Sequence, residues 1–227
     1  MKTYFKLLSF LVFALFVLTS RDASAQYCTP YAYYPQYGYL TRVIFNGIDN
    51  SSTYNSSGYS NYSNIVSSPC VLGQTYQLQL RGYSLWGGYY PGYLLYIDWN
   101  RNNVFESSEL VSYSWDYGMT SDGSFTVNVT IPMSAAKGQT RMRILYSGYY
   151  WYAWYVYYYY GPCSGYYYME WEDYTINIVA KQNDAGIVDI VSPVDKFDSY
   201  QNQQVQVRLK NFGKFFPLTS VTINWSV

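Results

Sequence analysis

The chain has 227 residues, with 14 basic and 14 acidic side chains, 32 tyrosines and no histidine. Its balanced charge gives no electrostatic basis for binding nucleic acid or an anionic membrane surface. Without histidine it cannot use Ser-His-Asp or Cys-His catalysis, a histidine-containing zinc site or the metallopeptidase histidine motif. Among enzyme mechanisms, a carboxylate pair of the glycoside hydrolase kind remains open.

Residues 1–25 are predicted to be a signal peptide that is not part of the fold. Lys2 and Lys6 form a basic start, residues 7–19 form an apolar core, and residues 23–25 form a small-x-small cleavage site. The apolar run is shorter than the roughly 20 residues that a membrane span requires, so we expect no membrane span. From about Gln26 onward the chain carries 11 basic and 13 acidic residues, a net charge of −2. We therefore expect a secreted or cell-surface protein.

Three cysteines follow the predicted signal peptide, and an exported chain permits a disulfide. Three pairings are possible, and one thiol is left over in each. We expect Cys28 to pair with Cys163, because each lies beside a proline or in a turn-like context at the borders of the same predicted domain. Cys70 would then be free or would pair with another chain.

The first part of the exported chain is predicted to form short strands separated by turns. Residues 27–40 are rich in tyrosine and proline and are expected to be extended. Alternating or β-prone apolar residues predict strands at 41–45, 75–80 and 93–97. Residues 49–68 contain mainly serine, asparagine, tyrosine and glycine, and we expect a loop there.

Residues 98–109 follow the last of these strands and have the spacing of an EF-hand calcium loop. Calcium takes about six to eight oxygen ligands, and a short loop supplies them from alternate residues. The expected ligands are Asp98, Asn100, Asn102, Val104 through its carbonyl, Glu106 and Glu109. Asn103 replaces the usual glycine at the turn, which asparagine tolerates because it enters the left-handed region readily. The alternative is a plain asparagine-rich turn held by its own side chains, which would not need Glu109.

Further strands are predicted at residues 109–113, 125–131, 140–146 and 172–179. In one of them Arg141 and Arg143 share a face, and we expect them to pair with an acidic ladder on a neighbouring strand. That ladder is Glu170 and Glu172, with Asp173 beside them. The alternative is catalysis, because Glu170 and Glu172 would lie about 7 Å apart on one strand face, a spacing compatible with an inverting glycosidase.

Residues 149–168, the aromatic tract, contain many tyrosines and tryptophans broken by Gly161-Pro162-Cys163 and Gly165. The rings could stack on sugars, bind a protein or pack as a layer over the sandwich. Tyrosine-rich surfaces give large amphipathic contact areas with few rotatable bonds, as in antibody paratopes. We expect a glycan- or protein-binding surface formed by Trp151, Trp154, Tyr157 and Tyr159.

Outside residues 1–25 no stretch shows a convincing helical period, and the many short strands predict an all-β fold. We expect an antiparallel β-sandwich of jelly-roll or Ig-like type over residues 26–180, with the calcium loop attached to a strand. Residues 181–183 are a predicted linker. Residues 184–227 alternate as strands but are too few for an Ig-like module of about 100 residues, so we expect an incomplete second Ig-like domain and further domains of the same polypeptide.

Several motifs resemble the GEVED domain, a β-sandwich module of exported bacterial proteins that is common in Bacteroidetes. They are residues 96–102, Glu109, residues 140–143 and residues 172–178. The name-giving Gly-Glu-Val-Glu-Asp falls on residues 169–173, where both glutamates and the aspartate match while the glycine and valine do not. The resemblance covers roughly residues 27–180 and implies a module that accompanies secreted peptidases, adhesins and other multidomain surface proteins.

Residues 184–227 resemble the start of a bacterial adhesion-type Ig-like domain, and such proteins often carry a sorting domain for type IX secretion. Together these features predict a non-catalytic, calcium-stabilised binding or accessory module of a secreted or cell-surface multidomain protein. The alternative is a carbohydrate-active hydrolase that uses Glu170 and Glu172.

Overall fold

The structure is a computed structural model that describes residues 26–86, 91–114, 123–180, 185–193, 204–212 and 218–224. The predicted signal peptide (1–25) and the predicted linker (181–183) lie outside the described residues. Within the described part of the chain, no helix is long and apolar enough to cross a membrane.

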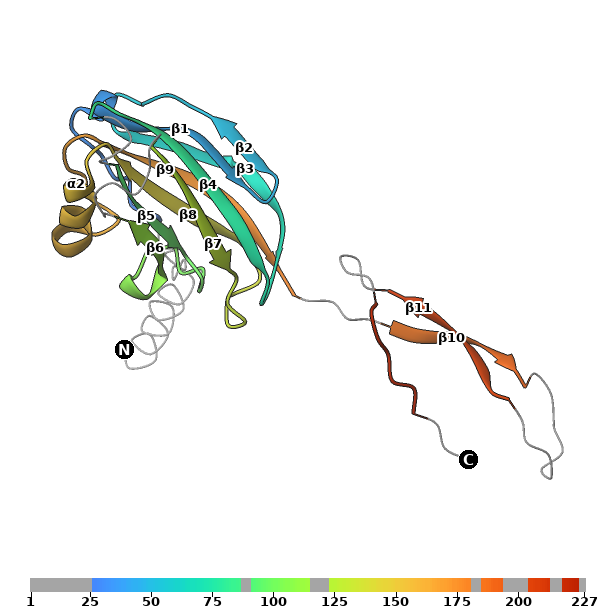
Figure 1. The fold of residues 1–227 in the computed structure, drawn as a ribbon. Helices are drawn as coiled ribbons and strands as arrows, with labels where there is room; N and C mark the ends of the chain where they lie inside the picture. The colour runs from blue at the N-terminus through green and yellow to red at the C-terminus, as the bar shows by residue number, and fades with distance from the viewer. Residues whose placement is uncertain are drawn as a thin grey trace, which may run out of the picture.

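Residues 38–179 form two sheets packed face to face (Figure 1). The four-stranded sheet has the order β2-β1-β4-β7, and all its neighbours are antiparallel. Its strands are β1 (Gly38–Phe45), β2 (Ile48–Ser51), β4 (Thr75–Ser84) and β7 (Ser124–Thr130). The five-stranded sheet has the order β3-β9-β8-β5-β6. Its strands are β3 (Tyr59–Val71), β5 (Gly92–Ile97), β6 (Leu110–Ser114), β8 (Gly138–Ser147) and β9 (Met169–Val179).

The expected all-β sandwich is present, but it is not purely antiparallel, because β3 runs parallel to β9. Every other neighbouring pair in the two sheets is antiparallel. The main core lies between the sheets, where Leu40, Phe45 and Leu80 from one sheet meet Ile144 and Ile176 from the other. Alternation along each strand sends every second side chain into this core.

The expected loop at residues 49–68 was wrong, since β2 and most of β3 occupy it. β3 is an edge strand with few buried side chains, and its backbone is held by the parallel pairing with β9. An edge strand of this kind does not need an apolar face. Its polar composition therefore lacked the alternating apolar residues from which a strand could be predicted.

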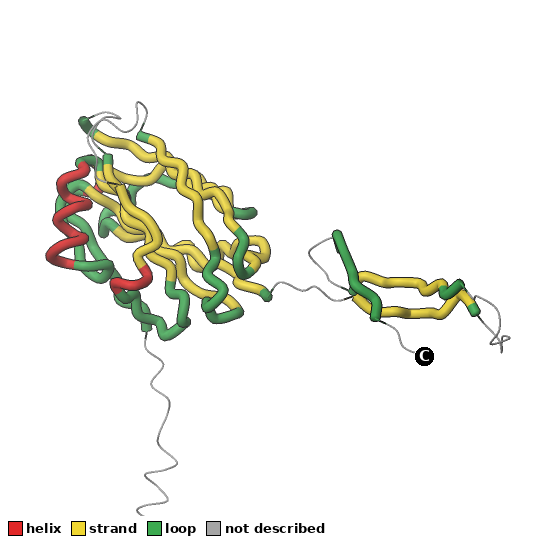
Figure 2. Tube along the Cα trace, turned by 60° about the horizontal axis from the view of Figure 1, so that its bottom comes forward, coloured by secondary structure: helices red, strands yellow, loops and turns green. Residues whose placement is uncertain are grey.

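A second core covers the outer face of the five-stranded sheet. Here the aromatic tract forms α2 (Tyr150–Tyr155) and the five-residue π-helix η3 (Val156–Tyr160), which the sequence pattern did not predict. Ala153 and Val156 are fully buried and pack with Leu94, Leu145 and Trp171 of the sheet. Figure 2 shows these helical segments in red along one side of the strands.

Two short 3₁₀ segments, η1 (Pro35–Tyr37) and η2 (Ser107–Glu109), precede β1 and β6. A separate two-stranded antiparallel sheet consists of β10 (Ala185–Ser192) and β11 (Gln206–Asn211). Ile187, Ile190 and Leu209 are exposed on it. The β character expected for residues 184–227 is therefore confirmed for these two strands, whereas the described residues 218–224 form no strand.

Candidate functional site

The loop at residues 98–109 is organised by Asp98, which follows β5 and is fully buried. Its Oδ1 accepts a hydrogen bond from the Arg101 amide at 2.6 Å, and its Oδ2 accepts one from the Asn103 amide at 3.0 Å. The Tyr27 hydroxyl also donates to Oδ2. Arg101 and Asn103 have φ values of 61° and 64°, so the turn uses the left-handed conformation that was expected at Asn103.

Glu109 closes the loop from its other end. Its Oε1 accepts from the amides of Trp99 (2.9 Å) and Asn100 (3.3 Å), and its Oε2 accepts from the Glu106 amide (3.1 Å). Burial raises the pKa of the Glu109 carboxyl, while the amide donors oppose that rise. The glutamate at position 12 therefore holds the backbone of the loop.

The remaining expected calcium ligands lie on the exposed side of the loop. Glu106 accepts from Asn100 Nδ2 at 3.1 Å and from Asn102 Nδ2 at 3.0 Å, so three of the predicted side chains converge. Val104 is exposed. In the described residues, no group of three or more His, Cys, Asp or Glu side chains is arranged to hold a metal. The oxygen donors suit calcium chemically, but hydrogen bonds within the loop already hold them.

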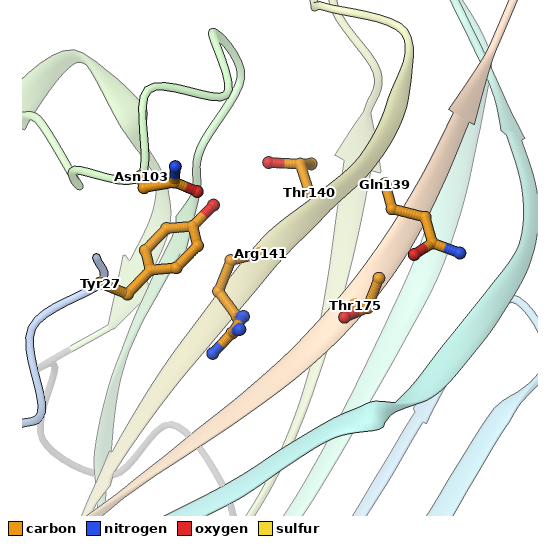
Figure 3. Close-up of a pocket in the computed structure, with 6 residues that line it drawn as sticks. All are labelled: Tyr27, Asn103, Gln139, Thr140, Arg141 and Thr175. Carbon is orange, nitrogen blue, oxygen red and sulfur yellow. The ribbon is translucent and has the colours of Figure 1, made fainter. Parts of the chain in front are cut away.

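A small polar pocket of about 120 Å³ lies beside this loop (Figure 3). It is lined by Tyr27, Asn103, Gln139, Thr140, Arg141 and Thr175. The Arg141 guanidinium carbon is 4.7 Å from the centre of the Tyr27 ring. Burial, together with the hydrogen bond to Asp98, raises the pKa of Tyr27 to about 12. All three hydroxyls of these lining residues already donate hydrogen bonds, since Tyr27 and Thr140 donate to Asp98 and Thr175 donates to the Ser63 carbonyl.

Of the three acidic residues expected to pair with Arg141 and Arg143, Asp173 does so, whereas the expected pairing with Glu170 and Glu172 was wrong. Arg143 makes a bidentate ion pair with Asp173, with Nε to Oδ1 at 2.7 Å and Nη2 to Oδ2 at 2.8 Å. Arg141 donates to the same carboxylate at 2.9 Å. Arg143 faces Asp173 across the β8–β9 ladder, whereas Glu170 and Glu172 are on the opposite face of β9. Side chains alternate along a strand, so adjacent residues cannot share one ladder face.

The arginine cluster also joins the disulfide. Cys28 and Cys163 are bonded, with their Cα atoms 5.5 Å apart, which confirms the pairing expected from the sequence. Arg143 donates to the Cys28 carbonyl at 2.7 Å and to the Pro162 carbonyl at 2.9 Å, so it ties both sides of the disulfide to β8. Cys70 is a free, buried thiol whose pKa is raised by burial.

Glu170 and Glu172 point into the space between the sheets and are 0% exposed. Glu170 Oε1 accepts from the Asn55 amide at 3.1 Å and from Ser60 Oγ at 3.0 Å. Glu172 accepts from Ser52 Oγ at 2.7 Å and from the Tyr174 hydroxyl at 2.6 Å. Burial, then repulsion from Glu172, raises the pKa of Glu170 to about 8, and burial raises the pKa of Glu172 to about 7.

The four predicted ligand-binding residues of the aromatic tract lie together on α2 and η3. Trp151 and Trp154 stack at 5.1 Å with an interplanar angle of 24°, and Trp154 is 6.0 Å from Tyr159. Trp151 is 49% exposed and Tyr159 is 64% exposed. Tyr157 stacks on Tyr113 of β6. The same helical segments therefore bury Ala153 and Val156 against the sheet and expose a row of rings.

The structure adds neighbours that the sequence argument missed. Residues 31–34 run beside residues 166–168, with a backbone bridge between Tyr33 and Tyr167. Tyr34 stacks on Tyr167 at 6.1 Å with an angle of 14°. The tyrosine- and proline-rich composition of residues 27–40 was the available signal, but only the tertiary structure joins it to the aromatic tract.

The model of the GEVED domain family matches residues 92–177. This span runs from β5 through most of β9 and includes the loop at 98–109, the arginine cluster, the two buried glutamates and the aromatic tract. The match supports the resemblance drawn from the motifs in this part of the chain. No curated protein matches the sequence.

Proposed function

We propose that this chain is a non-catalytic binding or accessory module of a secreted or cell-surface multidomain protein. In this proposal, the exposed rings of the aromatic tract recognise a glycan or a protein. The observation that carries it is the division of α2 and η3 into a buried side, with Ala153 and Val156, and an exposed side, with Trp151 and Tyr159. Packing on the sheet does not require the exposed rings.

The chemistry of the surface favours a neutral ligand. Residues 149–168 contain no Asp, Glu, Lys or Arg, so recognition would depend on ring faces and phenol hydroxyls. Tyrosine and tryptophan provide large contact areas at low conformational cost and form many binding hot spots. The sheet beneath gives such a surface a rigid support.

The buried position of Glu170 and Glu172 weighs against the hydrolase alternative. A glycosidase pair must flank the scissile bond of a substrate and admit water in the inverting case. Both carboxyls are instead fully buried, and they accept hydrogen bonds from Ser52 and Asn55 in the connection between β2 and β3.

Binding of the full chain to an array of neutral polysaccharides would test the recognition surface. We expect one class to be retained, with tryptophan fluorescence changing on binding, and the variant Trp151→Ala with Trp154→Ala to lose binding by at least about tenfold. Tyr83→Ala is the matched control, because Tyr83 is an exposed ring on β4 of the other sheet. If the double variant does not fold, the aromatic tract is part of the hydrophobic core and not a recognition surface. Polysaccharide cleavage that depends on Glu170 would instead support the hydrolase alternative.

We also propose that residues 98–109 bind calcium weakly through Asp98, Asn100, Asn102, the Val104 carbonyl, Glu106 and Glu109. Support comes from the alternating oxygen donors and from the convergence of Asn100, Asn102 and Glu106. We expect a dissociation constant on the order of 10⁻⁴–10⁻³ M, the range of extracellular modules. Calorimetry should show weaker binding in Glu106→Gln, whose side chain is exposed. Unchanged binding in that variant would contradict the assignment.

A further inference from the structure

Within the part of the chain that the structure describes, the inner face of β9 carries two carboxyls with no basic partner. In the described residues, the ion pairs are Arg42–Asp49, Arg141–Asp173, Arg143–Asp173 and Arg208–Asp189, and neither Glu170 nor Glu172 belongs to one. Both glutamates are fully buried. Burying a carboxylate without a compensating charge is strongly unfavourable, so these two groups require a neutralising partner.

One oxygen of the pair also lacks a well-formed hydrogen bond from any described residue. Glu170 Oε1 accepts two hydrogen bonds, whereas Glu170 Oε2 is buried and accepts no well-formed hydrogen bond within the described part of the protein. The Leu40 backbone contributes least among the groups that lower the pKa of this carboxyl. Ser114 Oγ and Trp171 Nε1 are also buried without a hydrogen bond among the described residues, but neither group carries a charge. An unpartnered buried carboxylate oxygen is the most costly of the three.

The surroundings of the pair supply further oxygens. Ser60 Oγ lies 3.0 Å from Glu170 Oε1, and Ser52 Oγ lies 2.7 Å from Glu172 Oε1. Ser52 Oγ is also 3.2 Å from the Leu40 carbonyl oxygen, at the point where the register of β1 shifts. Residues i and i+2 of a strand are about 7 Å apart on one face, so two glutamate side chains can reach a common ion.

We propose that Glu170 and Glu172 hold one hard divalent cation of the calcium type between the two sheets. Carboxylate, hydroxyl and carbonyl oxygens are the donors that such a cation prefers, and two carboxylates would balance its charge. The pair has fewer than three carboxylates, so serine hydroxyls and a carbonyl complete its donor set. The raised pKa values of both glutamates agree with a place where charge needs compensation, which a proton supplies when no cation is bound.

The cation would cross-link parts of the chain that the Cys28–Cys163 disulfide does not join. Glu170 and Glu172 belong to β9, Ser60 to β3, and Ser52 to the connection that follows β2. A bound ion would therefore fasten the connection between β2 and β3 to the five-stranded sheet. It would act independently of the loop at 98–109, whose ligands are different residues.

Calcium binding to the full chain at pH 8 tests this inference, with calorimetry for stoichiometry and the melting temperature as a second readout. Glu170→Gln with Glu172→Gln should lose one calcium equivalent and the associated rise in melting temperature. Glu106→Gln should keep that equivalent, which separates this site from the loop. Asp49→Asn, which removes an exposed carboxylate from β2, is the matched control and should bind as the parent does.

In chelator at pH 8, the amide variant should melt at or above the melting temperature of the parent, because it removes uncompensated charge while keeping an oxygen for Ser60 and Ser52. This result would show that loss of calcium binding is not loss of fold. If the double variant does not fold, Glu170→Gln alone carries the test, since it alters the oxygen that lacks a partner. Calcium stoichiometry unchanged in the folded Gln variant, or a parent melting temperature insensitive to calcium, would overturn the proposal and leave protons as the neutralising partner.

Discussion

The two faces of β9 give neighbouring carboxylates different hydrogen-bond donors, charged on the outer face and neutral on the inner face. On the outer face, Asp173 is buried but receives hydrogen bonds from Arg141, Arg143 and the Tyr59 hydroxyl. On the inner face, Glu170 and Glu172 are equally buried and receive hydrogen bonds from neutral donors. One position along a strand therefore decides whether a carboxylate meets a guanidinium or the interior of the sandwich.

This difference separates the two faces by role. The outer cluster fastens the disulfide segments to the sheet, since Arg143 bonds to Asp173 and to backbone carbonyls at both ends of the bridge. The inner pair has hydrogen bonds but no charge balance within the described residues. We infer that the outer face contributes constant stability, whereas the inner face makes stability depend on solution conditions.

Removing the Asp173 carboxylate should strongly lower the stability that the outer face contributes. Asp173→Asn leaves Arg143 buried without a full charge partner, and we expect a loss of about 3–5 kcal/mol in the free energy of unfolding. Urea unfolding of the full chain would measure it. A double-mutant cycle between Arg143→Met and Asp173→Asn should show strong coupling.

The matched cycle on the exposed pair Arg42 and Asp49 should give much weaker coupling, because water screens an ion pair at the surface. A cycle between Arg143 and Glu172 should give little coupling, because these side chains lie on opposite faces of the sheet. Strong coupling there, with none to Asp173, would contradict the assignment of the faces.

Removing the disulfide should have the next largest effect. Cys28→Ser with Cys163→Ser opens a loop with a sequence separation of 135 residues. We expect a loss of roughly 4–5 kcal/mol in the free energy of unfolding according to the chain-entropy model. Calcium binding at Glu170 and Glu172 should survive in the folded fraction, because the inner face does not contact the bridge. Non-reducing peptide mapping of the parent that placed Cys70 in a disulfide would show the pairing to be wrong.

The pH dependence of stability tests the contribution of Glu170 and Glu172 on the inner face of β9. Both glutamates have folded-state pKa values above their ordinary 4.5, so the folded protein holds protons that the unfolded chain releases. In chelator, stability should be greatest below about pH 4.5 as far as these groups are concerned, and should fall as pH rises toward 8. Each pKa unit corresponds to about 1.4 kcal/mol, so we expect stability to fall by several kcal/mol over this range, measured by urea unfolding at several pH values. Glu170→Gln with Glu172→Gln should flatten this slope, and an equal slope in both proteins would contradict it.

Much of the sandwich could be predicted because strand signals are local. Alternating apolar residues marked β4, β7 and β8, and the apolar run before Asp98 marked β5. The loop at 98–109 was also recognisable, since its side-chain spacing and the left-handed Asn103 both follow from sequence. The disulfide followed from the position of its cysteines at the borders of one domain.

The parts that were missed depend on tertiary contacts. β3 lacks an apolar face because its parallel pairing with β9 supplies its hydrogen bonds. α2 and η3 span only residues 150–160, and two small buried side chains, Ala153 and Val156, anchor them among rings that mask any helical period. Glu170 and Glu172 were misassigned as arginine partners beside Asp173, because sequence spacing alone does not say which alternate residues of β9 face the core.

The burial of Glu170 and Glu172 without a basic partner is tested most directly by a carbon-detected NMR titration of the side-chain carboxyls. The full chain is titrated in the presence of chelator. We expect Glu170 and Glu172 to titrate in two coupled steps near pH 8 and pH 7, far above the ordinary 4.5, and calcium to shift both steps downward. Titration of both groups near pH 4.5 without calcium would contradict the burial of an uncompensated carboxyl pair, because carboxyls with that pKa are hydrated or have their charge compensated.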